Sequence, residues 1–294
     1  MPASYALVTH ADGWRTVEPK PSPAALKAFY AQEYFQASHG IYAQAYSETE
    51  RTHRALIARL LLFAAGKGRR GAGGRLLEVG CGEGWLLAAA QDAGFDVRGL
   101  DFSDDGLKRL HPALLPKATF GDVFESLDGL IADGAQFEVV AMEHVLEHVL
   151  DPERLLETLP RVIAPGGVVA ITVPNDFSPA QQALRAAGQI DRDFWVAPPQ
   201  HLNYFDAPSL GRLLARSSFE VAIGYASFPI DWFLFHGGSN YVADPAQGKP
   251  AHQARMAIDL MLAEQGIDAY LGLAEALYRC GAGRSLTVIA RPRS

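Results

Sequence analysis

The chain of 294 residues has few cysteines, no surplus of basic residues and no long apolar run. Its two cysteines, Cys81 and Cys280, are too few for a disulfide framework or a zinc cluster. The formal net charge of −7 leaves no basic face for nucleic acid. No apolar run reaches the roughly 18 residues of a membrane span, and the first residues lack the pattern of a signal peptide. We therefore expect a cytoplasmic protein with no nucleic-acid or membrane partner.

A glycine turn between an apolar strand and an apolar helix organises the rest of the chain. Residues 75–85 read RLLEVGCGEGW, and the glycines stand at alternate positions: Gly80, Gly82 and Gly84. Glycine permits a positive φ and lets a ligand approach the backbone, and the helix that follows turns its free N–H groups toward that ligand. Glu78 and Glu83 would repel the pyrophosphate that a G-x-G-x-x-G turn binds. They suit a ligand that carries an ammonium and a sulfonium group, and we expect Glu83 to face it.

This stretch resembles motif I of the class I S-adenosylmethionine (SAM) dependent methyltransferases, in which an acidic residue precedes three alternate glycines. Glu78 and the three glycines match the motif position for position, and Cys81 lies inside the turn, where a small side chain is needed. The resemblance implies an α/β fold with a seven-stranded, doubly wound (Rossmann-like) sheet, helices on both faces and an antiparallel last strand. It also implies SAM as the cofactor.

Asp101 extends the predicted cofactor site to the end of the next strand. It closes a predicted strand over residues 95–101, 17 positions beyond Gly84, where a doubly wound fold holds the ribose hydroxyls of its ligand. A carboxylate accepts two hydrogen bonds and so matches a vicinal diol. The alternative is a solvated Asp101 beside a helix cap at Ser103 or Asp104.

Asp122 follows a short predicted strand over residues 118–120. The resemblance places an acidic residue here at the adenine amino group, whereas by itself Asp122 is an ordinary turn aspartate. The predicted cofactor residues are together Glu78, Gly80, Cys81, Gly82, Gly84, Asp101, Phe102, Asp122, Val123 and Glu143.

A fourth predicted strand, residues 137–142, runs into a loop over residues 143–149 that reads EHVLEHV. An Asp-Pro pair then starts a helix, a Pro-Gly-Gly turn ends it, and an apolar strand follows over residues 168–173. This order of elements resembles the same methyltransferases, so the resemblance covers residues 75–175.

Three histidines are candidates for the general base of methyl transfer to a hydroxyl group. The cofactor already carries a good leaving group, so the protein mainly aligns the acceptor and removes its proton. A histidine, with an ordinary pKa of about 6.5, suits that task near neutral pH. We expect His144, at the ligand-binding edge of the sheet, to be the base, His148 to orient the loop, and His201 to be a second candidate. A structural role for all three stays open.

The same loop contains a pattern that metal sites also use. His144, Glu147 and His148 match the H-x-x-E-H pattern of inverted zinc proteases, but that pattern belongs on a helix and here follows a strand. The loop also resembles that of ubiquinone-pathway O-methyltransferases, whose acidic-rich version holds a divalent ion. His144 replaces one of their carboxylates while Glu147 and His148 remain, and we expect no metal.

The residues before the glycine turn, 1–74, form the expected N-terminal helical lid. It consists of an irregular start over residues 1–24, a helix over residues 24–35 and a long amphipathic helix over residues 48–65. Its tyrosines pair at helical spacing, Tyr30 with Tyr34 and Tyr42 with Tyr46. They either pack in a core or, as the resemblance implies, edge the methyl group.

Residues 75–294 form the expected methyltransferase domain, with acceptor-side inserts at about 176–207 and 226–284. We expect Asn175, after the fifth strand, to point to the acceptor side. The second insert, with its aromatic FPIDWF segment, resembles a subgroup of bacterial methyltransferases of surface-glycan and nonulosonic-acid pathways. Arg284 at its end would meet a phosphate or carboxylate. The same residues would equally pack a homodimer interface or cap the sheet.

These features predict SAM-dependent transfer of a methyl group to an oxygen of a small-molecule acceptor. The favoured acceptor is a sugar or nucleotide-linked sugar of a surface-glycan pathway. The loop resemblance leaves a quinone or phenol as the alternative, and a SAM-binding regulatory protein without turnover is a further one. The glycine spacing and Glu78 disfavour a nicotinamide oxidoreductase.

Overall fold

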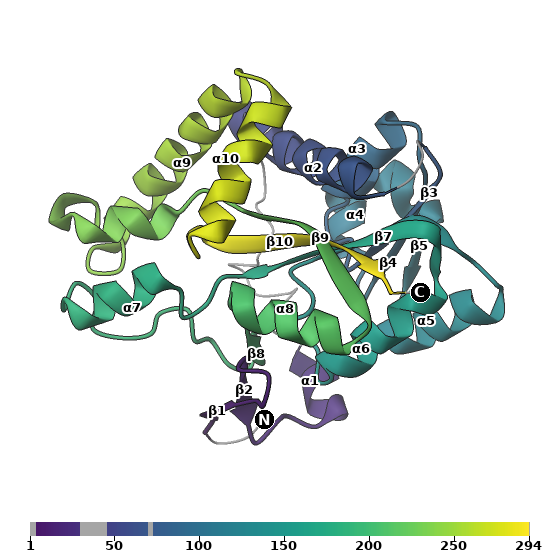
Figure 1. The fold of residues 1–294 in the computed structure, drawn as a ribbon, viewed down its shortest axis with the longest axis horizontal. Coiled ribbons are helices and arrows are strands. Elements are labelled where there is room, and N and C mark those ends of the chain that lie inside the picture. Colours follow the sequence, from purple (N-terminus) through teal and green to yellow (C-terminus); the bar gives the residue numbers. More distant parts are fainter. Residues whose placement is uncertain (1–3, 30–45, 70–72, 294) are drawn as a thin grey trace.

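A seven-stranded mixed sheet forms the centre of the computed structural model, which describes residues 4–29, 46–69 and 73–293 (Figure 1). The strand order is β5-β4-β3-β6-β7-β10-β9. The bounds are β3 Arg75–Val79, β4 Asp96–Asp101, β5 Ala118–Phe120, β6 Phe137–Glu143, β7 Ile163–Pro174, β9 Phe219–Ala226 and β10 Ser285–Pro292. Strands β5, β4, β3, β6 and β7 run parallel, and β10 pairs antiparallel with both β7 and β9. The predicted fold and its antiparallel last strand are confirmed.

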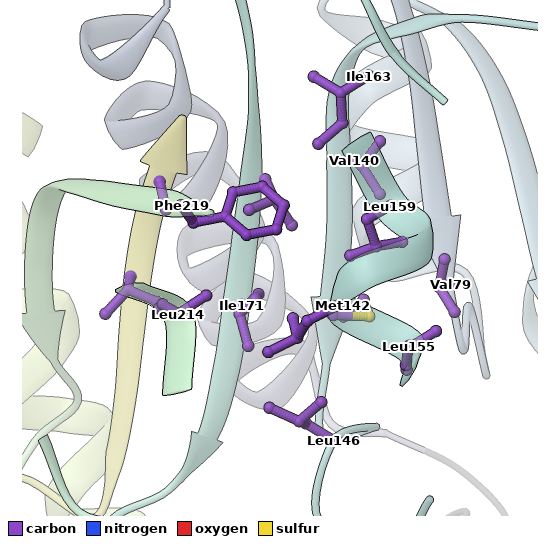
Figure 2. Close-up of a cluster of buried hydrophobic side chains, with 14 of the residues drawn as sticks. Val79, Val140, Met142, Leu146, Leu155, Leu159, Ile163, Ile171, Leu214 and Phe219 are labelled. Carbon is purple, nitrogen blue, oxygen red and sulfur yellow. The ribbon is translucent and has the colours of Figure 1, made fainter. Parts of the chain in front are cut away.

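Helices cover both faces of this sheet (Figure 1). One layer contains α2 Glu48–Gly68, α3 Trp85–Asp92, α4 Asp105–Leu110 and α10 Ile267–Arg279, and the other contains α5 Val123–Ala132, α6 Pro152–Thr158 and α8 Ala207–Arg216. Successive side chains of a strand point to opposite faces, so β6 supplies both layers. Val139 and Ala141 pack with the first layer, and Val140 and Met142 with the second. Figure 2 shows Val140 and Met142 among the buried side chains of the second layer, together with Leu155 of α6.

The N-terminal residues form a hairpin, so the prediction of an irregular segment over residues 1–24 was wrong. β1 pairs antiparallel with β2, and β2 pairs with β8 of the first insert, the bounds being Ala6–Thr9, Arg15–Glu18 and Asn203–Tyr204. Trp14 and Val17 are buried and anchor the hairpin, although β1 itself is exposed. A two-residue partner strand far along the chain stabilises this small sheet, and no local pattern reveals such a partner.

Most of the remaining helices lie in the predicted lid and inserts, whereas the two short ones over residues 112–117 and 159–161 follow α4 and α6. They are α1 Pro23–Phe29, α7 Pro179–Ala186 and α9 Gly248–Ala263, with short 3-10 helices η2 Pro112–Lys117, η3 Leu159–Arg161, η4 Ile230–Phe235, η5 Gly237–Ser239 and η6 Pro245–Gln247. Tyr30, Tyr34 and Tyr42 lie outside the described residues. The role of residues 1–74 as a lid stays a prediction. Within the described ranges, no helix is both long and apolar enough to cross a membrane.

Candidate active site

One cavity of about 1150 Å³ lies at the carboxyl ends of β3, β4, β5 and β6, beneath α2 and α9. Ligand pockets commonly measure about 300–1,000 Å³, so this cavity has room for a cofactor and an acceptor together. All of the predicted cofactor residues line it: Glu78, Gly80, Cys81, Gly82, Gly84, Asp101, Phe102, Asp122, Val123 and Glu143. His144 and His148 line it as well, whereas His201 does not.

The glycine turn has the backbone geometry that its sequence predicts. Gly80, Gly82 and Gly84 have φ values of 77°, 49° and 80°, in the left-handed region that favours glycine. Space is also short, because a Cβ at Gly84 would lie 2.4 Å from Leu107 Cδ2. The Cys81 thiol packs inside this turn, where burial raises its pKa, so it is neither a reactive thiol nor a ready metal ligand.

Asp101 fixes the glycine turn through its side chain. Its Oδ2 accepts a hydrogen bond from Gly82 N at 2.7 Å, and its Oδ1 accepts one from Ser103 N at 3.1 Å. Burial raises the pKa of Asp101, and these hydrogen bonds partly offset the rise. Asp101 is therefore not a simply solvated carboxylate. A carboxylate has about four lone-pair sites. Each oxygen of Asp101 can therefore still accept a hydrogen bond from a ribose hydroxyl.

Glu78 is a buried carboxylate that lacks a complete set of partners. The residue is 3% exposed, and Oε2 has no hydrogen-bond partner among the described residues. Burial, followed by the negative charges of Glu143 and Asp101, raises its pKa well above the ordinary range. A buried polar atom without a partner is costly. Because Glu78 lines the cavity, a ligand ammonium would supply the missing donor, which fits the amino-acid end of SAM.

Glu83 lines the cavity, in keeping with the expectation that it faces the ligand, but partners within the protein already engage its carboxylate. The hydroxyl of Tyr46 lies 2.9 and 2.8 Å from its two oxygens, and Trp85 Nε1 donates to Oε2 at 3.0 Å. Arg54 Nη1 lies 3.7 Å from the same oxygen. Glu83 therefore joins the glycine turn to the start of α2.

Arg54 is a cavity residue that the sequence analysis misses. Besides pairing with Glu83, its guanidinium carbon lies 4.6 Å from the centroid of the Tyr46 ring, a cation–π contact. In the sequence it is one polar residue of an amphipathic helix, which usually faces water. The fold instead places this cation beside the glycine turn, at the cofactor end of the cavity.

Asp122 caps the helix that follows its strand. Its Oδ1 accepts hydrogen bonds from Phe124 N at 2.8 Å and Glu125 N at 3.1 Å, at the start of α5. The sequence analysis does not predict α5. Asp122 also lines the cavity, so the cap holds it at the position that the resemblance implies, and its contact with adenine stays a prediction.

His144 combines a strained backbone with a carboxylate partner. Its φ is 56°, and its backbone N–H donates to the backbone oxygen of Thr172 at 2.9 Å. Its Nδ1 lies 3.0 Å from Glu147 Oε1, while its side chain is 48% exposed. When Nδ1–H donates to Glu147, Nε2 is the nitrogen that can accept a proton. Strain of this kind is typical of functional residues.

The charges around His144 favour its protonated form. Desolvation lowers the pKa of His144, but the hydrogen bond to Glu147 and the charges of Glu147 and Glu143 outweigh it, and the net pKa is raised. Burial likewise opposes ionisation of Glu147, but the hydrogen bond from His144 and the nearby histidines give a lowered pKa. Glu147 is thus an anion that makes His144 a stronger base, as a carboxylate does in a catalytic triad.

His148 and His201 connect the loop after β6 to the first insert. His148 Nδ1 lies 2.6 Å from Gln200 O, and the two imidazole rings meet edge to face with centroids 5.0 Å apart. Burial lowers the pKa of His201 to about 4. Because His201 lies outside the cavity lining and is a weak base near neutral pH, the geometry favours His144 among the three candidates.

Glu147, His148 and His201 bring their ligand atoms within 4.8 Å of one another. Two imidazoles and a carboxylate are a donor set that divalent ions such as zinc accept. Glu147 Oε2 and His201 Nδ1 are buried and have no partner among the described residues. These residues would therefore fit an ion beside His144, and His148 is the one of the three that also lines the cavity. The expectation of no metal stays a prediction.

Asn175 and Arg284 fasten the end of the second insert to β7, in place of the acceptor contacts that the sequence analysis expects. Asn175 Nδ2 donates to Gly281 O at 3.1 Å and Gly283 O at 2.9 Å. Arg284 Nη1 lies 3.1 Å from Asp176 Oδ1. Neither Asn175 nor Arg284 lines the cavity.

The sequence matches the model of the methyltransferase domain family over residues 49–222, which is more than half of the chain. The chain belongs to the SAM-dependent methyltransferases. SAM is accordingly its cofactor, and the cavity at the glycine turn has the shape, the glycines and the acidic residues to receive it.

Two curated relatives are ubiquinone biosynthesis O-methyltransferases. The protein from Thiobacillus denitrificans is 36% identical over 106 residues, which cover 35% of this methyltransferase and 46% of that protein. The protein from Caulobacter sp. (strain K31) is 29% identical over 191 residues, which cover 64% of this chain and 70% of that protein. The chain spans about half the length of most of the curated relatives that it matches.

Solved structures of methyltransferases share the fold. A SAM-dependent methyltransferase from Archaeoglobus fulgidus superposes with a TM-score of 0.50 at 18% identity, covering 81% of this chain and 93% of that one. The 1,6-didemethyltoxoflavin-N1-methyltransferase of Burkholderia thailandensis, solved with its substrate and S-adenosylhomocysteine, gives a TM-score of 0.52 at 14% identity over 100% and 98% of the two chains.

Proposed function

We propose that this methyltransferase transfers the methyl group of SAM to a phenolic or quinol-type hydroxyl, with His144 as general base. The observation that carries the proposal is the half-exposed His144 imidazole, backed by Glu147 at 3.0 Å, at the edge of the cofactor cavity. The hydroxyl oxygen forms a bond to the methyl carbon as the sulfonium–methyl bond breaks. The hydroxyl proton passes to His144 Nε2, and the sulfur leaves as neutral S-adenosylhomocysteine.

Apolar side chains in the part of the cavity that follows His144 support an acceptor with an apolar ring. Apolar side chains come from α2 and from the loop after β6, including Ile57, Val145, Val149 and Leu150. The residues that favoured a sugar, Arg284 and the aromatic residues 228–235, do not line the cavity. The similarity to ubiquinone biosynthesis O-methyltransferases also favours the quinone or phenol alternative.

The test is a methylation assay in which catechols and nucleotide sugars compete as acceptors of labelled methyl from SAM. We expect methyl ethers of the catechols. His144→Ala should lower turnover about 10²–10⁴-fold while SAM affinity, measured by calorimetry, stays near that of the natural protein. The matched control is His236→Ala, because His236 is exposed and outside the cavity.

Three outcomes would contradict the proposal. Methylation of the nucleotide sugar alone would restore the surface-glycan acceptor. Full activity of His144→Ala would exclude His144 as the base, and a loss confined to His201→Ala would transfer that role. SAM binding without turnover on any acceptor would favour a regulatory protein.

A further inference from the structure

Two helices, α2 and α9, contribute polar side chains to the lining of the cavity. The cavity-lining residues of α9 are spaced three and four apart and therefore share one face: His252, Arg255, Met256 and Asp259. Those of α2 follow the same spacing: Glu50, His53, Arg54 and Ile57. Tyr225, Ser227, Ser285 and Thr287 line the opposite wall, from β9, β10 and the residues next to them. Apart from Arg54, which reaches the glycine turn, the cofactor site explains none of these polar groups.

Arg255 has no ion-pair partner in the part of the chain that the structure describes. No hydrogen bond or carboxylate contact joins its guanidinium to a described side chain, and its Nε is buried without a partner. Burial lowers the pKa of Arg255, and the charge of Asp259 only partly offsets this. A buried cation is costly unless an anion or a hydrogen-bond acceptor meets it. Among the described residues, Arg255 is therefore a cavity cation without an ion-pair partner.

The carboxylates of the same two helices are engaged by other groups. Asp259 Oδ2 lies 2.8 Å from His53 Nε2, and Asp259 Oδ1 accepts from the Tyr270 hydroxyl at 2.8 Å. Glu50 belongs to the capping box at the start of α2. Burial and then the charge of Arg255 lower the pKa of His252, which favours the neutral form of this histidine. These contacts leave the requirement of Arg255 for an anion unmet.

Tyr225 is a further polar residue of the cavity lining. Burial raises the pKa of Tyr225, its hydroxyl bonds to Thr287, and the charge of Glu143 acts on it. The charge of Tyr225 in turn raises the pKa of Tyr270, whose hydroxyl donates to Asp259. His144 and Arg255 both line this cavity, so the proposed general base and the cation belong to one chamber.

We propose that Arg255, together with His252, binds a carboxylate of the methyl acceptor, so that the acceptor is an aromatic hydroxy acid. The proposal rests on the proposed methyl transfer: the hydroxyl faces His144 while the carboxylate faces Arg255. A planar guanidinium matches a carboxylate through two parallel hydrogen bonds. Arg54 lies beside Glu83 at the glycine turn and is better placed for the carboxylate of SAM. Arg255 would then be left for the carboxylate of the acceptor.

The experiment compares protocatechuic acid, a catechol carboxylate, with its neutral amide. Calorimetry on protein saturated with S-adenosylhomocysteine measures binding of each probe, and a methylation assay measures kcat/KM. We expect the acid to bind about 10- to 100-fold more tightly than the amide, as hydrogen bonds to a charged group usually give. Arg255→Gln should remove most of that preference, and Arg255→Lys, which keeps the charge but loses the planar fork, should restore part of it.

The matched control is Arg279→Gln, which removes the same charge from a side chain that is 67% exposed on α10. It should retain the full preference for the acid. Equal binding of acid and amide by the natural protein would overturn the proposal, as would an Arg255→Gln protein that binds SAM poorly and the acid normally. Acid-selective binding without methylation would instead contradict the proposed function and leave the anion site standing.

Discussion

Gly106 lies where α4 touches the glycine turn, and its replacement by alanine tests whether that contact shapes the cofactor site. A Cβ at this position would lie 2.4 Å from Gly82 O, 2.6 Å from Gly82 C and 2.9 Å from Glu83 N. All three are backbone atoms, so no side-chain rotation relieves the overlap. The turn, or the whole of α4, would have to move.

The expected magnitude follows from two opposing effects. In an unhindered helix, glycine to alanine stabilises by about 1 kcal/mol. Overpacking of a tight contact costs about 1–3 kcal/mol, and a shifted turn also strains the 2.7 Å bond from Gly82 N to Asp101. We therefore expect Gly106→Ala to lower the free energy of unfolding by about 1–2 kcal/mol. The Kd for SAM should rise roughly tenfold, the loss of about one charged hydrogen bond.

Gly129→Ala provides the matched control. Gly129 lies inside α5, and a Cβ there would meet nothing within 4 Å. That variant should be stabilised by about 0.5–1 kcal/mol and bind SAM normally. Urea unfolding without ligand gives the free energies, and calorimetry gives the affinities. If Gly106→Ala were as stable as Gly129→Ala and bound SAM like the natural protein, the contact between α4 and the turn would have no role in the site.

Three further predictions concern the same cavity. Asp101→Ala should weaken SAM binding by about 1–3 kcal/mol through the loss of hydrogen bonds to the ribose; unchanged affinity in calorimetry would remove that role. Because Glu147 raises the pKa of His144 and only neutral His144 can act as a base, kcat/KM should fall as the pH drops through that pKa. Glu147→Gln should move this limb of the profile to lower pH, and an unmoved limb would mean that another group is titrating. EDTA should not change turnover, since the proposed transfer needs only SAM and the His144 base; a loss that zinc restores would make Glu147, His148 and His201 a metal centre.

The cofactor end of the site could be predicted because its determinants are local. The strand, the turn and the helix start all lie within residues 75–85, and the positive φ angles found there require glycine. Asp101 follows at a spacing that the parallel β3 and β4 impose, since their carboxyl ends meet at one edge of the sheet. Every predicted cofactor residue accordingly lines the cavity.

Contacts between distant segments account for the errors. Glu83 lines the cavity, but Tyr46 and Arg54 of another segment engage its oxygens, which the sequence did not reveal. Asn175 follows a strand at the ligand edge, yet the carbonyls of Gly281 and Gly283 engage its amide. In both cases the residue type was suited to a ligand. What decided its role was a partner that lies far along the chain.

The acceptor end shows why a substrate is harder to predict than a cofactor. A polar helix face normally lies in water, so Arg255 in the sequence is indistinguishable from a surface cation. α9 packs against α2 and brings two such faces together over the strand ends. The same residues then line a cavity, where a cation without an anion is costly. The specificity of the acceptor site therefore arises from the packing of two amphipathic helices that are ordinary in sequence, and neither helix carries it alone.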